Sequence, residues 1–572
     1  MNDIFDIVIL DSCVHSIIES SKVDLNVILS NVTNELRITH ADKVFHVLEK
    51  NLKQKARCLN LVIEGDEAKF DLLTGLQFVL NNIDCKIISI SAGMDCCDAE
   101  YRKQLYIVCK NLYKKGIIIV AGFSNMGRIS YPAAFDCVIG VDMSLKCKRI
   151  HDFETVYSDM VNIRGTCIEQ SIIINNKKYF CGGTSFIVPL VVAEIYNNKL
   201  FYLSISEILD YFSSISRKVV KIEKTSTKRQ SNLFTIQKAI AFPFNKEIRN
   251  IARNLELINF EIIGFFDHKS RIRNSVTTVK NYESINWMLD FDTIILGHLE
   301  ELSIALRKNL LEYFIEKAIK YQKKVVFFDI LDENTEQILK AENIPFCSTS
   351  VNEIEDYSIN FGKLYNLSIP VIAIMGTRPK QGKFTLQMQL SKCFHEKGYN
   401  IGLLGSEPIS MLLGADATVI CGYGSSVKNN YDLVYDVNSK LFAIEEKGKE
   451  AVIIASQSQT IPAGFGNLAM YPLYQESILL GSLPDCVILC INYNDNIEYI
   501  DRTIKYIESF VNTKVIAIRI FNFSFKGEET LEQFSPELMK AKEQIAQKFN
   551  IPVFLSTENV LGIADAIISY LE

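Results

Sequence analysis

The sequence predicts an α/β protein that is built of parallel sheets and divided into several domains. Short apolar runs recur along the chain and alternate with longer helical stretches, which is the pattern of consecutive βαβ units. Many of the runs are continuously apolar, as in GIIIVAG and CVILCIN, and such runs suit strands that are buried on both faces. At 572 residues the chain is too long for a single core, so three or four domains are expected.

The first domain is expected over residues 1–220. Its helical segments lie between the strands, for example Ala99–Lys115. The expected strands are apolar runs of similar length that end in small or polar residues: Asp6–Leu10, Leu59–Gly65, Cys85–Ser91, Gly116–Gly122 and Cys137–Met143. Their order with the intervening helices predicts a doubly wound sheet.

A polar, charged stretch, Lys221–Asn232, predicts a linker because it lacks apolar anchors. The second domain is expected over residues 233–368, where KAIAFPFNKEIRNIAR at Lys238–Arg253 precedes further apolar runs. Its strands are expected at Phe260–Phe266, Asp292–Gly297 and Lys324–Ile330.

The third domain is expected over residues 369–572 and opens with the strand IPVIAIMG, Ile369–Gly376. Later strands are expected at Ala451–Ser456, Cys486–Asn492, Lys514–Ile520 and Ile551–Leu555. Their alternation with helical stretches predicts another α/β domain.

Composition narrows the classes of partner and compartment. The net charge is −6 and no long basic stretch occurs, which argues against nucleic acid as the main partner. The first residues lack a basic start and a long apolar core, and no run reaches the length needed to span a bilayer. The fifteen cysteines lack zinc-site spacing and lie mostly in apolar runs, as expected in a reducing compartment. We therefore expect a cytoplasmic protein with no metal site and no membrane partner.

Four segments of the first domain carry side chains suited to acyl transfer. Asp11 ends an apolar strand, His40 precedes a helical pattern, Asn125 lies in IVAGFSNMG, and Ser185 lies in CGGTSFIVP before an apolar helix. A carboxylate, an imidazole and a hydroxyl form a nucleophilic triad, in which His40 would take the Ser185 proton and Asp11 would orient His40. Asn125 could donate an N–H to the developing oxyanion.

This set resembles the subtilisin-like serine peptidases over roughly Asp6–Asn198. GTSFIVP is similar to the family's nucleophile motif, and IVAGFSNMG with the following YPAAF is similar to its oxyanion segment. ISISAG resembles the segment that pairs with an extended substrate. The resemblance implies a peptidase whose Ser91, Ala92 and Gly93 bind the peptide by strand addition, with no cofactor needed for proteolysis.

The sequence departs from that family at two places. His40 is followed by Ala41-Asp42 where the family has Gly-Thr, and Cys13 stands where the family has a glycine after the aspartate. His46 is an alternative base, although it lies inside the helix rather than at its start. A peptide-binding scaffold with an inactive peptidase fold is therefore the alternative for this domain.

The third domain opens with a strand, a glycine-containing loop and a helix, in the segment IAIMGTRPKQGKFT. Such loops hold phosphates with backbone N–H groups, and the lysine reaches the terminal phosphate oxygens. The candidate nucleotide-binding residues are Gly376, Thr377, Gly382, Lys383 and Thr385. Phe384 stands where a magnesium-binding hydroxyl is common, and Thr385 follows one place later. A glycine turn that binds no phosphate is the alternative.

GTRPKQGKFT resembles the loop of a P-loop family akin to dethiobiotin synthetases. That resemblance extends to IIASQSQTIP and LLGSLPDCVILC, and it implies ATP or GTP with magnesium as the ligand. The family carries an acidic residue where this chain has Ala455, and a missing carboxylate weakens the expectation of metal-assisted hydrolysis.

The segment AIAFPFNKEIRNIAR resembles the start of peptide-maturation proteins that have a Rossmann-like domain followed by a P-loop domain. Together the resemblances imply a subtilisin-like domain, a Rossmann-like domain and a P-loop domain. They imply an intracellular serine endopeptidase that removes the leader of a ribosomally made precursor peptide, alongside modifying enzymes of the same pathway. A different alternative is an ATP-dependent ligase or transferase that acts at Lys383.

Overall fold

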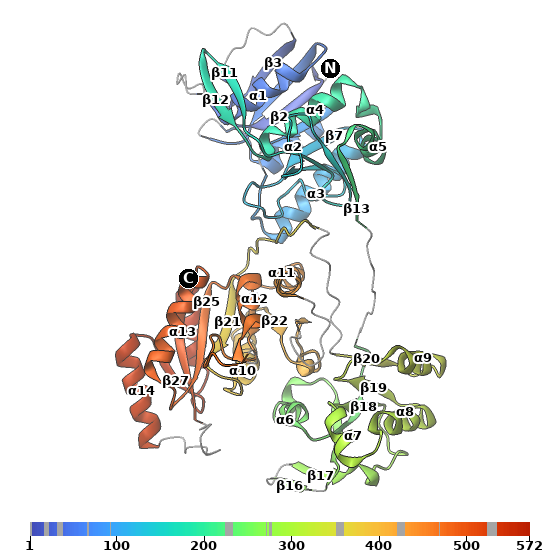
Figure 1. Ribbon diagram of the computed structural model, residues 1–572, viewed down its shortest axis with the longest axis vertical. Helices are drawn as coiled ribbons and strands as arrows, with labels where there is room; N and C mark the ends of the chain where they lie inside the picture. The colour runs from blue at the N-terminus through green and yellow to red at the C-terminus, as the bar shows by residue number, and fades with distance from the viewer. Residues whose placement is uncertain are drawn as a thin grey trace. The chain divides into compact units, whose positions relative to one another are not determined.

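The computed structural model of the chain describes residues 3–15, 22–30, 38–65, 68–91, 93–222, 233–269, 271–273, 277–349, 360–419, 429–467, 470–522 and 535–572. The chain divides into two compact units, each with helices and mainly parallel strands (Figure 1). Unit 1 comprises Met1–Thr225 and Tyr357–Ser368, and unit 2 comprises Ser226–Asp356 and Ile369–Glu572. The short stretch up to Ser368, which the sequence analysis assigns to the end of the second domain, thus packs with unit 1.

The main sheet of unit 1 has the strand order β13-β9-β10-β8-β7-β6-β2-β4-β3. From β3 through to β10 neighbouring strands pair in parallel, whereas β9 pairs antiparallel with β10. The strands are β2 (Ile7–Asp11), β3 (Val23–Ile28), β4 (Ala56–Val62), β6 (Ile87–Ile90), β7 (Ile118–Gly122), β8 (Ile139–Ser144), β9 (Glu154–Tyr157), β10 (Ile163–Thr166) and β13 (Lys218–Lys221).

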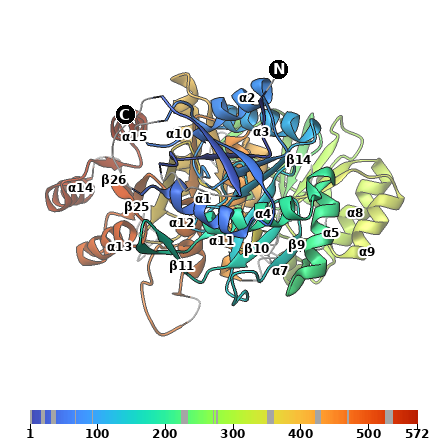
Figure 2. The same cartoon turned by 90° about the horizontal axis from the view of Figure 1, so that it is seen from above.

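Helices cover both faces of this sheet. Figure 2 shows α1 and α4 on one side and α2 and α3 on the other. The helices are α1 (His40–Asn51), α2 (Leu72–Asn82), α3 (Ala99–Lys114), α4 (Val188–Asn197) and α5 (Ile205–Ile215). The interior strand β2 is buried along its whole length, because each face lies under one of the hydrophobic clusters on the two sides. Its continuously apolar sequence follows from that double burial.

Shorter strands complete unit 1. The pair β1 (Asp3–Ile4) and β5 (Ile83–Asp84) is parallel, and β11 (Gln170–Ile174) pairs antiparallel with β12 (Lys177–Cys181). The hairpin of β11 and β12 leads directly into a 3-10 turn, η1 (Thr184–Phe186), and then into α4. Ser185 is the middle residue of this turn.

Unit 2 contains a sheet of order β16-β17-β15-β14-β18-β19-β20. Its strands are β14 (Lys238–Phe242), β15 (Glu261–Asp267), β16 (Arg271–Arg273), β17 (Thr277–Asn281), β18 (Thr293–Leu296), β19 (Lys324–Phe327) and β20 (Phe346–Ser348). The neighbouring helices are α6 (Lys246–Arg253), α7 (Glu300–Leu306), α8 (Leu310–Tyr321) and α9 (Glu333–Ala341). Pairing is parallel except between β16 and β17.

A further sheet of unit 2 has the order β23-β22-β24-β21-β25-β26-β27, and its pairs are parallel. Its strands are β21 (Val371–Gly376), β22 (Ile401–Gly405), β23 (Ala417–Thr418), β24 (Ala451–Ala455), β25 (Cys486–Asn492), β26 (Lys514–Phe521) and β27 (Val553–Leu555). The helices are α10 (Lys383–Glu396), α11 (Asn430–Glu445), α12 (Leu473–Ser482), α13 (Ile497–Phe510), α14 (Pro536–Phe549) and α15 (Leu561–Leu571). One buried cluster joins residues of both sheets of unit 2.

Within the described residues, no helix combines the length and the apolar character that crossing a bilayer requires. The cysteines among them are free thiols.

Candidate functional site

Asp11 and His40 form a hydrogen-bonded pair at the carboxyl end of β2, an interior strand of unit 1. His40 Nδ1 lies 2.9 Å from Asp11 Oδ1 and 3.1 Å from Asp11 Oδ2. Asp11 is the last residue of β2 and is fully buried. A carboxylate accepts hydrogen bonds, so His40 Nδ1 donates and Nε2 is left as the proton-accepting nitrogen of a neutral ring.

The start of α1 fixes His40, which is the first residue of that helix. Thr39 is the N-cap, and Thr39 and Asp42 form a reciprocal capping box. Asp42 also accepts from the backbone N–H of His15, and Ala41 N donates to Ser12 Oγ at 3.1 Å. The residues Ala41 and Asp42, which depart from the subtilisin-like pattern, thus have local roles in holding the helix start.

The electrostatic surroundings favour the protonated form of His40. Burial lowers the pKa of His40, but the hydrogen bond and charge of Asp11, with a smaller contribution from Glu64, outweigh it and raise the pKa above its ordinary value. Glu64 lies just beyond the end of β4, the strand next to β2. Burial and the nearby Asp11 raise the pKa of Glu64 in turn. His46 lies within α1, and burial lowers its pKa.

Ser185 lies in η1, close to His40. The ring of Phe186, the next residue, is 5.6 Å from the His40 ring, measured between centroids. Among the described residues, however, Ser185 Oγ donates to the carbonyl oxygen of Ser91 at 3.1 Å, and no hydrogen bond joins it to His40. Catalytic hydrogen bonds often form or tighten only when substrate is bound, so this geometry is compatible with a nucleophilic role for Ser185.

Asn125 is joined to the nucleophile turn by its side-chain oxygen. Asn125 Oδ1 accepts from Thr184 N at 2.9 Å and from Thr184 Oγ1 at 3.1 Å. Since the amide oxygen is occupied by these donors, the Asn125 Nδ2 group is the end left to donate. Thr184 is buried and its hydroxyl also donates to Phe123 O at 2.6 Å, so Thr184 couples the Asn125 loop to the Ser185 turn.

The turn that carries Ser185 requires glycine at residue 183. Gly183 has φ +108°, and a Cβ placed there would lie 2.7 Å from Asn125 Oδ1. Only glycine tolerates such a backbone conformation readily, and even a methyl group would displace the Asn125 amide. The close approach of these residues is thus built into the sequence Gly-Thr-Ser.

The predicted substrate-binding segment is described in part. Ser91 is buried, and its hydroxyl donates to Ser185 O at 3.3 Å. Gly93 is exposed, and a Cβ there would lie 2.9 Å from Gly122 O. Ala92 lies outside the described residues. Beyond Gly93, Met94 forms an isolated antiparallel bridge with Tyr131.

The predicted P-loop lies between β21 and α10 in unit 2. Lys383 is the first residue of α10 and is buried, and its Nζ donates to Arg378 O at 2.8 Å. A Cβ at Gly376 would lie 3.0 Å from Lys383 Nζ, so the lysine folds back over a glycine. Gly382 has φ +72°. This is the close approach that a phosphate-binding loop requires.

Asp495, which follows the neighbouring strand β25, binds this loop through its carboxylate. This residue was not predicted from the sequence. Its carboxylate accepts from Thr377 Oγ1, from Arg378 Nε at 2.7 Å and from Gln381 Nε2 at 3.3 Å. Gln381 also donates to Thr377 Oγ1 at 2.7 Å. Asp495 follows β25 in the motif NYND, whose position after an apolar strand was the signal that could have identified it.

The surroundings of Lys383 disfavour the charged form of its side chain. Burial, with a smaller contribution from Lys246, lowers the pKa of Lys383 to about 8, while Cys490 and Glu407 oppose the shift. Lys246 Nζ lies 3.1 Å from Glu407 Oε1. An anion bound at the loop would compensate the buried charge, so the residues present suit a phosphate. Thr385 is half-buried in the first turn of α10, after a buried Phe384.

Comparison with known proteins finds a match between part of the chain and one family model. Residues 358–561 match the P-loop domain of a domain of unknown function, DUF1611. No curated protein matches the chain.

Among solved structures, a DUF1611-family protein from Anabaena variabilis is 11% identical, with a TM-score of 0.43 over 59% of this chain and 99% of that chain. The prenylagaramide maturation protease PagA is 19% identical, with a TM-score of 0.26 over 34% of this chain and 75% of its own. The patellamide maturation protease PatA is 18% identical, with a TM-score of 0.27 over 36% of this chain and 85% of its own. Likeness at such scores establishes no shared function.

Proposed function

We propose that unit 1 is a subtilisin-like serine endopeptidase with Ser185 as nucleophile, His40 as general base and Asp11 as the group that orients His40. The observation that carries this is the Asp11–His40 hydrogen bond at 2.9 Å, formed beside the turn that holds Ser185. Asn125 supplies the oxyanion donor because Thr184 engages its side-chain oxygen.

The reaction follows the usual course of acyl transfer to a serine. Ser185 Oγ leaves Ser91 O and attacks the scissile carbonyl as its proton passes to His40 Nε2. Asp11 stabilises the resulting imidazolium through Nδ1. Asn125 Nδ2 donates to the oxyanion, and His40 then returns the proton to the leaving amine.

The substrate we propose is a ribosomally made precursor peptide from which the enzyme removes a leader in the cytoplasm. Support comes from the sequence resemblance to peptide-maturation proteins and from the backbone of Ser91 and Gly93, which the resemblance assigns to strand addition. Modifying enzymes of the same pathway are the expected partners.

A fluorophosphonate probe tests the peptidase proposal on the full-length protein. Wild type should be labelled covalently, and Ser185→Ala should not be labelled. Ser214→Ala is a matched control, because it removes an exposed hydroxyl of the same unit that donates to Tyr211 O within α5. Equal labelling of wild type and Ser185→Ala, or none in wild type, would contradict the proposal and favour a peptide-binding scaffold.

We also propose that the P-loop of unit 2 binds ATP or GTP with magnesium. The observation that favours this is the buried Lys383, whose ammonium donates to a backbone carbonyl and has a lowered pKa. Gly376, Thr377, Gly382 and Thr385 would line the phosphate site with it. Ala455 lies at the end of β24, where it supplies no carboxylate, so we propose binding rather than fast hydrolysis.

Titration calorimetry of the full-length protein with MgATP and MgGTP tests this second proposal. Binding should take up a proton at pH values near and above 8, because a bound phosphate restores the charge of Lys383. Above that pH the affinity should fall by up to about tenfold per pH unit. Lys383→Met should remove both effects, whereas Lys397→Met, which loses an exposed ion pair with Asp565, should keep them. No heat with either nucleotide would contradict the proposal.

A further inference from the structure

Residues 360–365 come from far along the chain, yet they pack as part of unit 1. The backbone N–H of Ile129 donates to Leu364 O at 2.9 Å. Phe361 and Tyr365 pack against the buried cluster on the α2 and α3 side of the sheet, which includes Phe123 and Ile129.

Lys363 places a buried positive charge beside this cluster. Its Nζ lies 2.9 Å from Asp142 Oδ1, and both side chains are 7% exposed. The ammonium also lies 5.1 Å from the centroid of the Phe123 ring. Asp142 belongs to β8, and its neighbour Val141 accepts from Phe123 N at 2.9 Å. Lys363 is therefore fixed between β8 and the residue at which the Asn125 loop begins.

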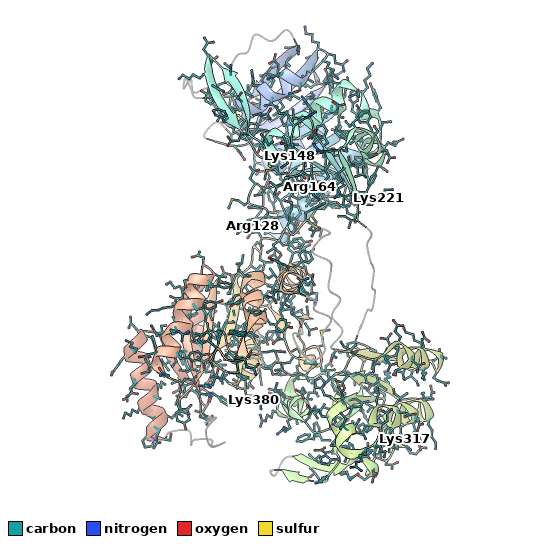
Figure 3. The ribbon with its side chains drawn as sticks, viewed as in Figure 1. Arg128, Lys148, Arg164, Lys221, Lys317 and Lys380 are labelled. Atoms are coloured by element: carbon teal, nitrogen blue, oxygen red, sulfur yellow. The ribbon has the colours of Figure 1, made fainter. Side chains whose placement is uncertain are left out.

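Lys363 belongs to a cluster of oppositely charged side chains. Arg164, labelled in Figure 3, contacts Asp142 Oδ2 at 3.5 Å and Glu154 Oε2 at 2.9 Å. The Arg164 guanidinium carbon lies 4.2 Å from the centroid of the Phe361 ring. Lys363 and Arg164 thus face two buried carboxylates, and the exposed Lys218 Nζ lies 4.0 Å from Glu154 Oε1. Removing Lys363 would leave a buried carboxylate undercompensated, which is costly in a protein interior.

The backbone conformation of residues 361–362 also indicates that surrounding contacts hold this segment in place. Phe361 has φ +55° and is followed by Gly362 at φ +75°. A bulky residue in the left-handed region is uncommon, and it persists where surrounding contacts fix it. Here those contacts are the Arg164 guanidinium and the buried cluster.

These contacts involve both ends of the loop formed by residues 123–131, which carries Asn125. Lys363 lies against Phe123 at one end, and Leu364 accepts from Ile129 at the other. Phe123 O in turn accepts from Thr184 Oγ1. We infer that residues 360–365 brace this loop and that Lys363 is a positioning residue for the oxyanion donor Asn125. The inference deepens the proposed peptidase function and depends on it for its catalytic consequence.

The test compares rates of fluorophosphonate labelling of Ser185 in the full-length protein, in a double-mutant cycle. Lys363→Met should slow labelling by about tenfold or more, because misplacement of about 1 Å can cost ~10²-fold. In an Asn125→Ala background the same substitution should change the rate by no more than about twofold, since the group it positions is absent. Lys363→Arg should restore most of the rate.

Two further readouts separate positioning from general damage. The acid limb of the pH–rate profile should stay where it is in wild type, because His40 and Asp11 are untouched. Hydrogen exchange at the Ile129 amide should become faster in Lys363→Met. Lys86→Met is the matched control: it removes an ion pair with Asp6 in the same unit, before the start of β6, and should alter neither labelling nor exchange at Ile129.

The outcomes are distinct. Equal slowing in both backgrounds would overturn the positioning role, as would unchanged labelling with unchanged exchange. If wild type is not labelled, the peptidase proposal fails, and exchange at Ile129 alone decides the brace: faster exchange in Lys363→Met supports it and unchanged exchange overturns it. Should Lys363→Met not fold, Phe361→Leu removes the ring contact with Arg164, keeps the ion pair, and should show the same coupling to Asn125 at smaller size.

Discussion

At the scale of single residues, the candidate active site depends on how charge is distributed around one imidazole. Asp11 is buried and touches His40 directly, whereas Glu64 acts on it through space. Both carboxylates favour the imidazolium, and burial of the ring opposes them. If His40 is the general base that we propose, it binds its proton more tightly in this setting and would accept the serine proton with more driving force.

The first prediction concerns the orienting carboxylate. Asp11→Asn should lower the rate of Ser185 labelling by up to ~10⁴-fold, as loss of the aspartate does in serine triads, because His40 loses its partner at Nδ1. Stopped-time labelling followed by mass spectrometry measures the rate. Asp6→Asn, which changes an aspartate near the other end of β2, should keep the rate near that of wild type. A similar small effect for both variants would contradict the role of Asp11.

The second prediction concerns pH. The acid limb of the labelling profile should lie above the ordinary histidine pKa of about 6.5, since the net shift of His40 is upward. Glu64→Gln should move that limb to lower pH without a large loss of maximal rate. An acid limb that is unchanged in Glu64→Gln would show that Glu64 does not influence His40.

The raised pKa also has a consequence for stability. The folded state holds the His40 proton more tightly than the unfolded chain, so this group stabilises the fold below the unfolded pKa. That contribution is lost as pH rises through the higher folded pKa.

At the scale of elements, the decisive feature is the turn between β12 and α4. The chain leaves an antiparallel hairpin, passes through Gly183 at positive φ, and enters η1 with Ser185 in its middle. Thr184 anchors the turn to the Asn125 loop by its N–H and its hydroxyl. The turn that carries Ser185 and the loop that carries Asn125 are thus parts of one hydrogen-bonded assembly rather than independent loops.

The third prediction tests that assembly. Gly183→Ala places a methyl group 2.7 Å from Asn125 Oδ1 and strains a backbone at φ +108°. We expect a loss of about 1–3 kcal/mol in the free energy of unfolding and strongly reduced labelling of Ser185. Chemical denaturation and probe labelling measure the two effects. Gly116→Ala, which has positive φ but open space around it, should lose stability without losing labelling.

Much of the element structure could be predicted from the sequence, for a definite physical reason. Strands such as β2, β7 and β25 are buried on both faces, so they read as uninterrupted apolar runs. Shorter or half-exposed strands, such as β9 and those of the β11–β12 hairpin, lack that signal. Residues 35–37 of the strand-like ELRIT lie outside the described residues.

Only those residues of the candidate site that lie in recognisable sequence motifs could be predicted. Asp11 and His40 were named from their motifs, and the structure places their side chains in hydrogen-bond contact. The resting partner of Ser185 Oγ, the carbonyl of Ser91, could not be foreseen, because backbone carbonyls leave no mark in a sequence. The Lys363–Asp142 pair was missed because 221 residues separate its members.

At the scale of the whole molecule, unit 1 is discontinuous in sequence. The chain leaves it after Thr225, forms part of unit 2, and returns for residues that end at Ser368. The entropic cost of closing such a long loop rises only weakly with the length of the loop. The contacts of Lys363 and Phe361 must still be made before unit 1 is complete.

The fourth prediction follows from that connectivity. A chain that ends at residue 225 should unfold at lower denaturant concentration than unit 1 of the intact protein, because Asp142 and Arg164 lose their partners at 363 and 361. A synthetic peptide of residues 358–368 should bind it and restore stability, as a ligand of the native state does. The same peptide with Lys363→Met should not. Equal stability with and without the native peptide would contradict this account.

The returning segment also sets an order of events during synthesis. Ser185, His40 and Asp11 all leave the ribosome well before Lys363 does. If unit 1 is the peptidase that we propose, a nascent chain carries Ser185 long before residues 360–365 exist to brace the Asn125 loop, and full hydrolytic competence would arrive late in translation. A newly made molecule would in that case be kept from cutting its neighbours while it is still being assembled.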